Sequence, residues 1–201
     1  MDDIKRFLET AKDSPFLDMF KLAIHTGMRR SELTGLKWDG IDFTTNTLRV
    51  TGTLQRIIGK GLVAGPPKTR TGRRTIALGA SAVELLHSVL GKQLALQAEI
   101  GDLYQNSEGY VFTDLTGNPI DSDRLSKEFR RVVKAAGLPG LSLHKLRHTH
   151  ASLLLAEGVN IKVISERLGH SNVPLTLNVY SHLLPGLQEH AAQVLDKMLA
   201  V

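Results

Sequence analysis

Residues 46–58, NTLRVTGTLQRII, are rich in β-branched side chains and alternate between apolar and polar positions. This pattern is typical of a β-strand and not of a helix. The extended stretch 62–68 and the segment 73–78 continue it, each after a short turn that contains glycine. The sequence therefore predicts a small three-stranded antiparallel sheet near residues 46–78, whose last hairpin is basic.

Both sides of this strand region have the periodicity of amphipathic helices. Residues 2–13 carry apolar side chains at spacings of 3, 1 and 3, which places them on one helical face. Residues 161–168 lie between Asn160, a preferred N-cap, and Gly169, a preferred helix end. Further helices are predicted at 16–25, 30–37, 81–100, 122–136, 142–157, 173–184 and 187–199. We therefore expect an α+β fold that is mainly α, a helical domain with a small three-stranded antiparallel sheet.

The chain has 201 residues and no cysteine. It is long enough to bury a core without disulfides, and it has no thiol nucleophile and no cysteine-bound zinc. No apolar run approaches the roughly 20 residues that span a bilayer, and the charged, amphipathic start is unlike a signal peptide. We expect a cytoplasmic protein with no membrane partner.

Positive charge is concentrated in two places. The net charge is only +5, but residues 56–74 hold six Lys or Arg and no acid. Residues 127–147 hold six more against one acid, Glu128. Such clusters suit a polyanion, most often a nucleic acid, although solvated faces balanced by acids elsewhere in the fold would give the same pattern.

Two short motifs place cations at bends of the chain. In TGMRRSEL (26–33), Arg29 lies between two predicted helices, and Glu32 is one helical turn away and could orient the guanidinium. The alternative is an ordinary surface ion pair. In PPKTRTGRR (66–74), Lys68 precedes a turn, where its ammonium could donate a proton or contact phosphate. The alternative is protection of a sheet edge.

The segment HKLRH (144–148) places His144 and Arg147 on one helical face. An imidazole and a guanidinium that face the same way suit an oxyanion or a phosphate. A metal site at His144 and His148 is disfavoured, because the Glu of HExxH is missing and Arg147 would repel a cation. A histidine with only a local hydrogen bond remains an alternative.

Two more candidates follow. His170, in LGHS, comes directly after a glycine that ends a helix, so it is expected on a loop, although it could simply cap that helix. Tyr180, in TLNVYSH, lies in a predicted helix, and its alternative is a buried core aromatic.

Taken together, these side chains suit metal-free attack on a phosphodiester. Two guanidinium groups and a histidine can neutralise the negative charge of the transition state. A phenol with a pKa of about 10 becomes a nucleophile when cations or a base assist it. The leaving alkoxide is strongly basic and needs a general acid, for which Lys68 is the candidate.

The motifs TGMRRSEL, PPKTRTGRR, HKLRHTHASLLL, LGH and TLNVY occur in an order that resembles the catalytic domain of tyrosine recombinases, the phage integrase family. The resemblance runs from about residue 3 to about residue 184. It implies site-specific DNA cleavage and rejoining through a 3′-phosphotyrosyl link, with neither metal nor cofactor. It also implies the roles of individual residues: Arg29, Arg147, His144 and His170 around the phosphate, Glu32 as the support of Arg29, Lys68 as general acid and Tyr180 as nucleophile.

The resemblance also sets expectations for partners and organisation. Double-stranded DNA is the expected partner, with contacts from Lys60, Arg70, Arg73, Arg74 and Lys145. We expect a monomer alone and a tetramer on DNA. Residues 1–201 are expected to be a catalytic domain without the N-terminal core-binding domain of the family, which predicts weak DNA binding and poor recombination. Residues 185–201 form a tail whose apolar stripe either docks on a neighbouring protomer or folds back.

Two alternatives differ in function. A type IB topoisomerase-like enzyme would use similar chemistry to relax DNA without exchanging strands. A DNA-binding module is suggested by the helix-turn-helix pattern of residues 160–184. However, its second helix, 173–184, contains no Lys, Arg or Gln to contact base edges.

Overall fold

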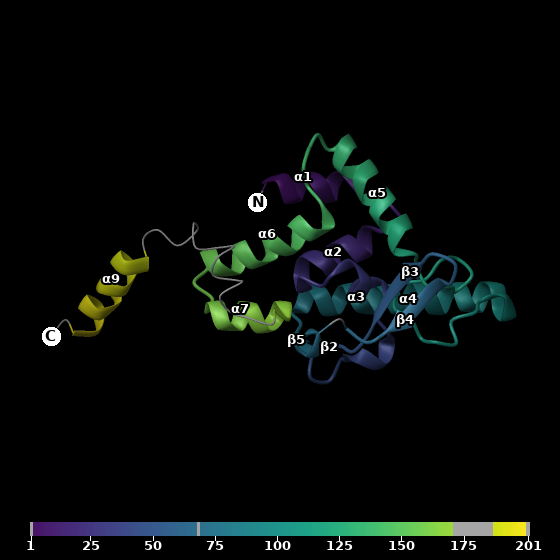
Figure 1. Ribbon diagram of the computed structural model, residues 1–201, viewed down its shortest axis with the longest axis horizontal. Coiled ribbons are helices and arrows are strands. Elements are labelled where there is room, and N and C mark those ends of the chain that lie inside the picture. Colours follow the sequence, from purple (N-terminus) through teal and green to yellow (C-terminus); the bar gives the residue numbers. More distant parts are fainter. Residues whose placement is uncertain (1, 68, 171–186, 200–201) are drawn as a thin grey trace.

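Figure 1 shows a computed structural model of the protein, which describes residues 2–67, 69–170 and 187–199. The chain is mainly helical with two small antiparallel sheets, so the expected fold class is confirmed. The predicted helix 173–184 lies outside the described residues. The α-helices are α1 (Asp2–Thr10), α2 (Leu17–Thr26), α3 (Arg30–Thr34), α4 (Ala80–Ile100), α5 (Ser122–Ala135), α6 (Leu143–Ala156), α7 (Ile161–Leu168) and α9 (Leu187–Leu199).

The strands do not pair as the sequence predicted. Strands β1, β2 and β5 form one antiparallel sheet in that order, and β3 and β4 form a separate hairpin. The predicted hairpin between the second and third strands is therefore wrong, because β4 and β5 belong to different sheets. The strands are β1 (Ile41–Asp42), β2 (Thr47–Val50), β3 (Thr53–Ile57), β4 (Gly61–Gly65) and β5 (Arg74–Ala77).

Local chemistry explains the difference. The stretch 46–58 is broken at Thr51-Gly52, so it supplies two strands to two sheets. Pro66 and Pro67 follow β4 directly, and proline has no N–H to continue a ladder. The 3₁₀ turn η2 (Arg70–Gly72) then leads into β5, which pairs with β2.

Two hydrophobic clusters hold the helices that carry the site. In the larger one, Phe7, Phe20 and Phe129 join α1, α2 and α5, with ring centroids 4.9–5.4 Å apart. A smaller cluster of Ala151, Ile164 and Leu168 packs α7 against α6. Burial of these side chains holds α2 against α1 and α5, and holds the end of α7 against α6.

Within the described part of the chain, every helix is too short or too polar to cross a bilayer. The α9 helix is set apart from the other elements in Figure 1, on the side where α6 connects to α7.

Candidate active site

Arg29 is held at the junction between α2 and α3. It occupies the N-cap position of α3, with φ −71° and ψ 155°. Its backbone N–H donates to Glu32 Oε2 at 2.8 Å, and its Nη1 donates to Glu32 Oε1 at 2.7 Å. The predicted pairing of Arg29 with Glu32 is therefore confirmed. It is not an ordinary surface pair, because the Glu32 side chain is 1% exposed.

Arg147 is a buried cation between the ends of two helices. It lies on α6 and is 4% exposed. Its Nη1 donates to the carbonyl oxygen of Gly27 at 2.7 Å, and its Nη2 donates to the carbonyl oxygen of Leu168. These carbonyls lie at the C-terminal ends of α2 and α7, where the helix dipole favours positive charge. The charge of a buried guanidinium is thus partly compensated while the group stays fixed.

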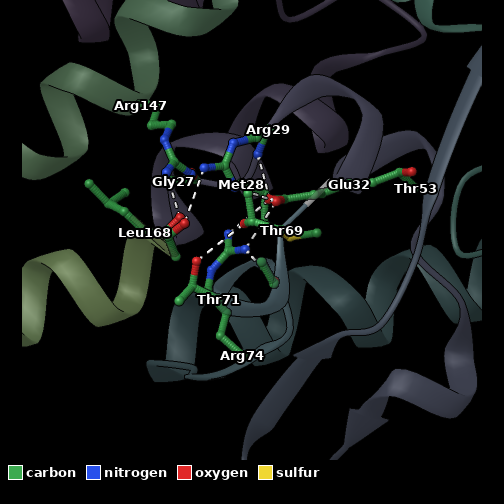
Figure 2. A network of polar contacts seen from close by, with 12 residues as sticks. Gly27, Met28, Arg29, Glu32, Thr53, Thr69, Thr71, Arg74, Arg147 and Leu168 are labelled. Atoms are coloured by element: carbon green, nitrogen blue, oxygen red, sulfur yellow. Dashed lines mark hydrogen bonds and ion pairs between the residues drawn. The ribbon is translucent and has the colours of Figure 1, made fainter. Parts of the chain in front are cut away.

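Arg29 reaches the same helix end. Its Nη2 donates to the carbonyl oxygen of Gly169 at 3.2 Å, next to the Leu168 carbonyl that binds Arg147. Figure 2 shows the two guanidinium groups lying side by side at the end of α7. Two cations from distant parts of the sequence are therefore held in one place by consecutive peptide groups.

Two glycines allow this close approach. Gly27 and Gly169 end α2 and α7 in the left-handed conformation, with φ 64° and 66°. A Cβ on Gly27 would lie 2.7 Å from Leu168 Cδ2, and a Cβ on Gly169 would lie 2.8 Å from the carbonyl oxygen of Thr71. Both the conformation and the space therefore require glycine.

Arg74 is buried, whereas a residue that contacts DNA is expected to be exposed. Its side chain is 5% exposed. Its Nη1 and Nη2 donate to the two oxygens of Glu32 at 3.0 and 2.8 Å, and its Nε donates to the carbonyl oxygen of Arg167 at 2.6 Å. The guanidinium is thus engaged inside the protein, and the expectation that it contacts DNA needs correction.

The carboxylate of Glu32 is charged although it is buried. Burial alone would raise the pKa of Glu32, but the hydrogen bonds and charge of Arg74, together with the donors of Arg29, hold the pKa below its usual value. Among Arg29, Arg74, Arg147 and Glu32, three cations face one anion. This group of side chains therefore carries a positive net charge that suits an anionic ligand.

The histidines differ in exposure. His144 is exposed on α6, and its ring packs edge to face on His148 with centroids 4.5 Å apart. His170 is half-buried just beyond α7, and its backbone N–H donates to the carbonyl oxygen of Ser165 at 3.0 Å. Burial, with the charges of Arg147 and Arg29, lowers the pKa of His170 to about 4. His170 is therefore neutral at pH 7.

Arg29, His144 and Arg147 line one open groove of about 890 Å³. Three further arginines line it too, Arg30, Arg56 and Arg130, none of which was among the predicted DNA contacts. Arg56 and Arg130 lie within the two basic clusters, but the sequence alone gave no reason to choose them from their neighbours.

The remaining predicted residues fall into three groups. Lys60, Arg73 and Lys145 have exposed side chains, as a contact to DNA requires, and Arg70 lies in η2. Lys68 and Tyr180, the predicted general acid and nucleophile, lie outside the described residues.

Among residues 2–67, 69–170 and 187–199, no three His, Asp or Glu side chains gather as metal ligands would. The structure thus brings together Arg29, Glu32, His144, Arg147 and His170.

Sequence comparison identifies relatives of this chain. The chain is 35% identical to a tyrosine recombinase XerC-like protein of Caldanaerobacter subterraneus subsp. tengcongensis, over 98% of this chain and 53% of that protein. It is 29% identical to the ICEBs1 integrase of Bacillus subtilis, over 98% of this chain and 54% of that protein. The chain thus spans about half the length of these relatives.

Solved structures of two integrases have a similar fold. The Tn1549 transposon integrase in complex with transposon right end DNA has a TM-score of 0.77 and 27% identity, and the match covers 98% of this chain and 64% of that one. The catalytic domain of bacteriophage HP1 integrase shares the fold, with a TM-score of 0.62 over 96% of this chain and 91% of that one.

The phage integrase family model matches residues 1–186. The chain therefore belongs to the phage integrase family, the tyrosine recombinases.

Proposed function

We propose that this chain cleaves and rejoins double-stranded DNA at specific sites through a covalent tyrosyl intermediate. One observation carries the proposal: Arg29 and Arg147 donate to the consecutive carbonyls of Gly169 and Leu168 and line the same groove. Fixed paired cations are what a pentacoordinate phosphoryl group, with its additional negative charge, requires. The DNA complex of the Tn1549 integrase supports DNA as the substrate.

In the proposed reaction, the phenol of Tyr180 releases its proton to solvent, and its oxygen attacks the phosphorus of the scissile phosphodiester. A bond forms between Tyr180 and the 3′ phosphate, and the bond from phosphorus to the 5′ oxygen breaks. Lys68 gives a proton to the leaving 5′ oxygen. Attack by a 5′ hydroxyl on the phosphotyrosine reverses these steps, so no external energy source is consumed.

Arg29 and Arg147 stabilise the nonbridging oxygens during both steps, because their hydrogen bonds to the protein hold them in place before DNA arrives. His144 lines the same groove and His170 is neutral at pH 7, and in this proposal a ring N–H of each donates a hydrogen bond to a phosphate oxygen. Exposed Lys60, Arg73 and Lys145, together with Arg70, contact the flanking phosphates in this proposal.

We further propose that four copies assemble on DNA, with the tail 185–201 available for contacts between them, and that the chain acts in the cytoplasm. The proposed assembly is tested by measuring the molecular mass of the particle in solution with and without a DNA duplex. A particle whose mass does not change on addition of DNA contradicts it.

A nicked suicide substrate tests the proposed reaction. Cleavage releases a short fragment that carries the 5′ hydroxyl, and once this fragment has dissociated the strands cannot be rejoined, so the covalent intermediate accumulates. The account predicts a covalent DNA adduct with the wild-type chain and none with Tyr180→Phe. A DNA-binding module gives no adduct with either chain. A topoisomerase-like enzyme gives the adduct and relaxes supercoils but yields no strand-exchange product between two DNA sites.

A further inference from the structure

A single buried carboxylate, that of Glu32, is shared by two arginines. Oε1 accepts from Arg29 Nη1 at 2.7 Å and from Arg74 Nη1 at 3.0 Å. Oε2 accepts from the Arg29 backbone N–H and from Arg74 Nη2, both at 2.8 Å. Four donors therefore fix both the position and the plane of the carboxylate.

Arg74 also binds the end of α7. Its Nε donates to the carbonyl oxygen of Arg167 at 2.6 Å, and its Nη1 donates to Gly72 at 3.0 Å. Its side chain passes so close to Gly169 that a Cβ there would lie 3.0 Å from Arg74 Cδ. The same guanidinium thus touches η2, α3 and the last turn of α7, as Figure 2 shows for Glu32 and Arg74.

The side chain of Arg167, in the last turn of α7, attaches this helix end to α2, α6 and β5. It donates to the carbonyl oxygens of Ala77 and His25 at 2.9 and 3.0 Å, and its Nε donates to His150 Nε2 at 3.2 Å. The carbonyls of Leu168 and Gly169, which hold the two groove arginines, immediately follow this fixed residue. Any shift of the helix end would move both acceptors.

We propose that Arg74 is a positioning residue for the cleavage reaction, which sets the orientation of Arg29 through Glu32 and the place of the Leu168 and Gly169 carbonyls through Arg167. This inference rests on the proposed function. Arg74 itself contacts no DNA, because its side chain is 5% exposed and its donors are used inside the protein. Its influence therefore belongs to the rate of cleavage and not to affinity.

Arginine is required at this position for a geometric reason. Its planar fork meets both oxygens of Glu32, while Nε points to a third acceptor. A lysine keeps the charge but offers one ammonium, which cannot serve Glu32 and the Arg167 carbonyl with the same geometry. The carboxylate is then free to rotate, and Arg29 rotates with it.

Arg74→Lys in the full chain tests the proposal, with single-turnover cleavage of the suicide substrate at saturating DNA. We expect cleavage about tenfold to hundredfold slower, because small misplacements of a catalytic group have effects of this size. The dissociation constant for DNA should stay within about twofold of wild type. Arg49→Lys is the matched control, because Arg49 is exposed on β2, opposite Thr75 of β5, and belongs to no part of the site.

Two further measurements separate positioning from stability. Glu32→Gln should slow cleavage as Arg74→Lys does, and the double variant should lose little more than either single variant, since both act through one carboxylate. Addition of ethylguanidinium to Arg74→Ala should restore part of the cleavage rate.

Equal cleavage rates for Arg74→Lys and wild type would overturn the inference. The inference would also be overturned if Arg74→Lys only lowered the melting temperature, or if it lowered the affinity for DNA and left the cleavage rate unchanged. The absence of any adduct with the wild-type chain would instead refute the proposed function.

Discussion

Arg29 caps the start of α3 and Arg147 lies on α6, yet their guanidinium groups donate to the consecutive carbonyls of Gly169 and Leu168. This relationship means that the two cations do not have to be gathered when a ligand binds. Their orientation is already determined by the end of α7, the carboxylate of Glu32 and the carbonyl of Gly27. Preorganised charge of this kind is the largest single contribution in many enzymes that stabilise anionic transition states.

Loss of either groove arginine should abolish most of the cleavage activity. Arg29→Ala or Arg147→Ala is expected to lower the single-turnover rate by roughly 10²–10³-fold, the usual cost of one such stabilising group. Arg29→Ala is the cleaner variant, because the Arg29 side chain is 40% exposed and its removal leaves the core intact. Arg131→Ala, which removes an exposed arginine paired with Glu128, is the control. An Arg29→Ala rate equal to that of Arg131→Ala excludes Arg29 from the site.

Acid should destabilise the fold through His150. Burial lowers the pKa of His150 from 6.5 to about 4, while its Nδ1 hydrogen-bonds the carbonyl oxygen of Ile24 at 2.8 Å. The unfolded chain therefore binds the proton more readily, and the free energy of unfolding falls as the pH drops from about 6.5 towards 4.

For His150 alone, the linkage gives a loss of roughly 2–3 kcal/mol between about pH 7 and pH 4.5. His170, whose pKa is also lowered to about 4, adds its own loss over the same interval in wild type and variant alike. His150→Asn keeps a donor for Ile24 but does not titrate, so urea unfolding of this variant should show a correspondingly smaller loss over the same interval. Parallel pH curves for variant and wild type contradict the assignment. Glu32, whose pKa is held below its usual value, contributes only at lower pH.

A chelator should not slow cleavage. In the proposed mechanism, Arg29 and Arg147 supply the positive charge that a divalent ion supplies in many other phosphoryl-transfer enzymes. Cleavage of the suicide substrate in the presence of EDTA should therefore match cleavage without it. Strong inhibition that added Mg²⁺ reverses indicates a metal-dependent step and removes the need for paired arginines.

The groove cations should contribute to the salt dependence of DNA binding. Each phosphate contact adds about 0.9 to the slope of log K against log salt concentration. Arg130→Ala removes an exposed arginine that lines the groove, so its slope should fall by about one. Arg131→Ala, one residue along α5 and paired with Glu128, should leave the slope unchanged. Equal slopes for both variants place the DNA elsewhere.

The starts of several helices could be predicted from the residues next to them in the sequence. Asn160 accepts from the Lys162 N–H and Ser142 from the Lys145 N–H, so the predicted starts of α7 and α6 follow from capping chemistry. Strand pairing could not be found this way. Strand β5 joins β2 and not β4, and that choice depends on tertiary contacts between segments distant in sequence.

In the candidate site too, contacts between neighbours in sequence could be predicted and contacts between distant residues could not. Arg29 and Glu32 are one helical turn apart, so their pairing was visible in the spacing. The interaction of Arg74 with Glu32 joins residues 42 positions apart, and only the fold brings them together. As a result, Arg74 looked like one more cation of a basic cluster, while its burial gives it a different environment.

Peptide mapping of the trapped covalent complex by mass spectrometry examines the central claim most directly. After digestion of the DNA–protein adduct, the account predicts a nucleotide attached through a 3′ phosphate to the peptide that contains Tyr180. Attachment to any other side chain, or the absence of a modified peptide from the wild-type chain under cleavage conditions, would contradict it.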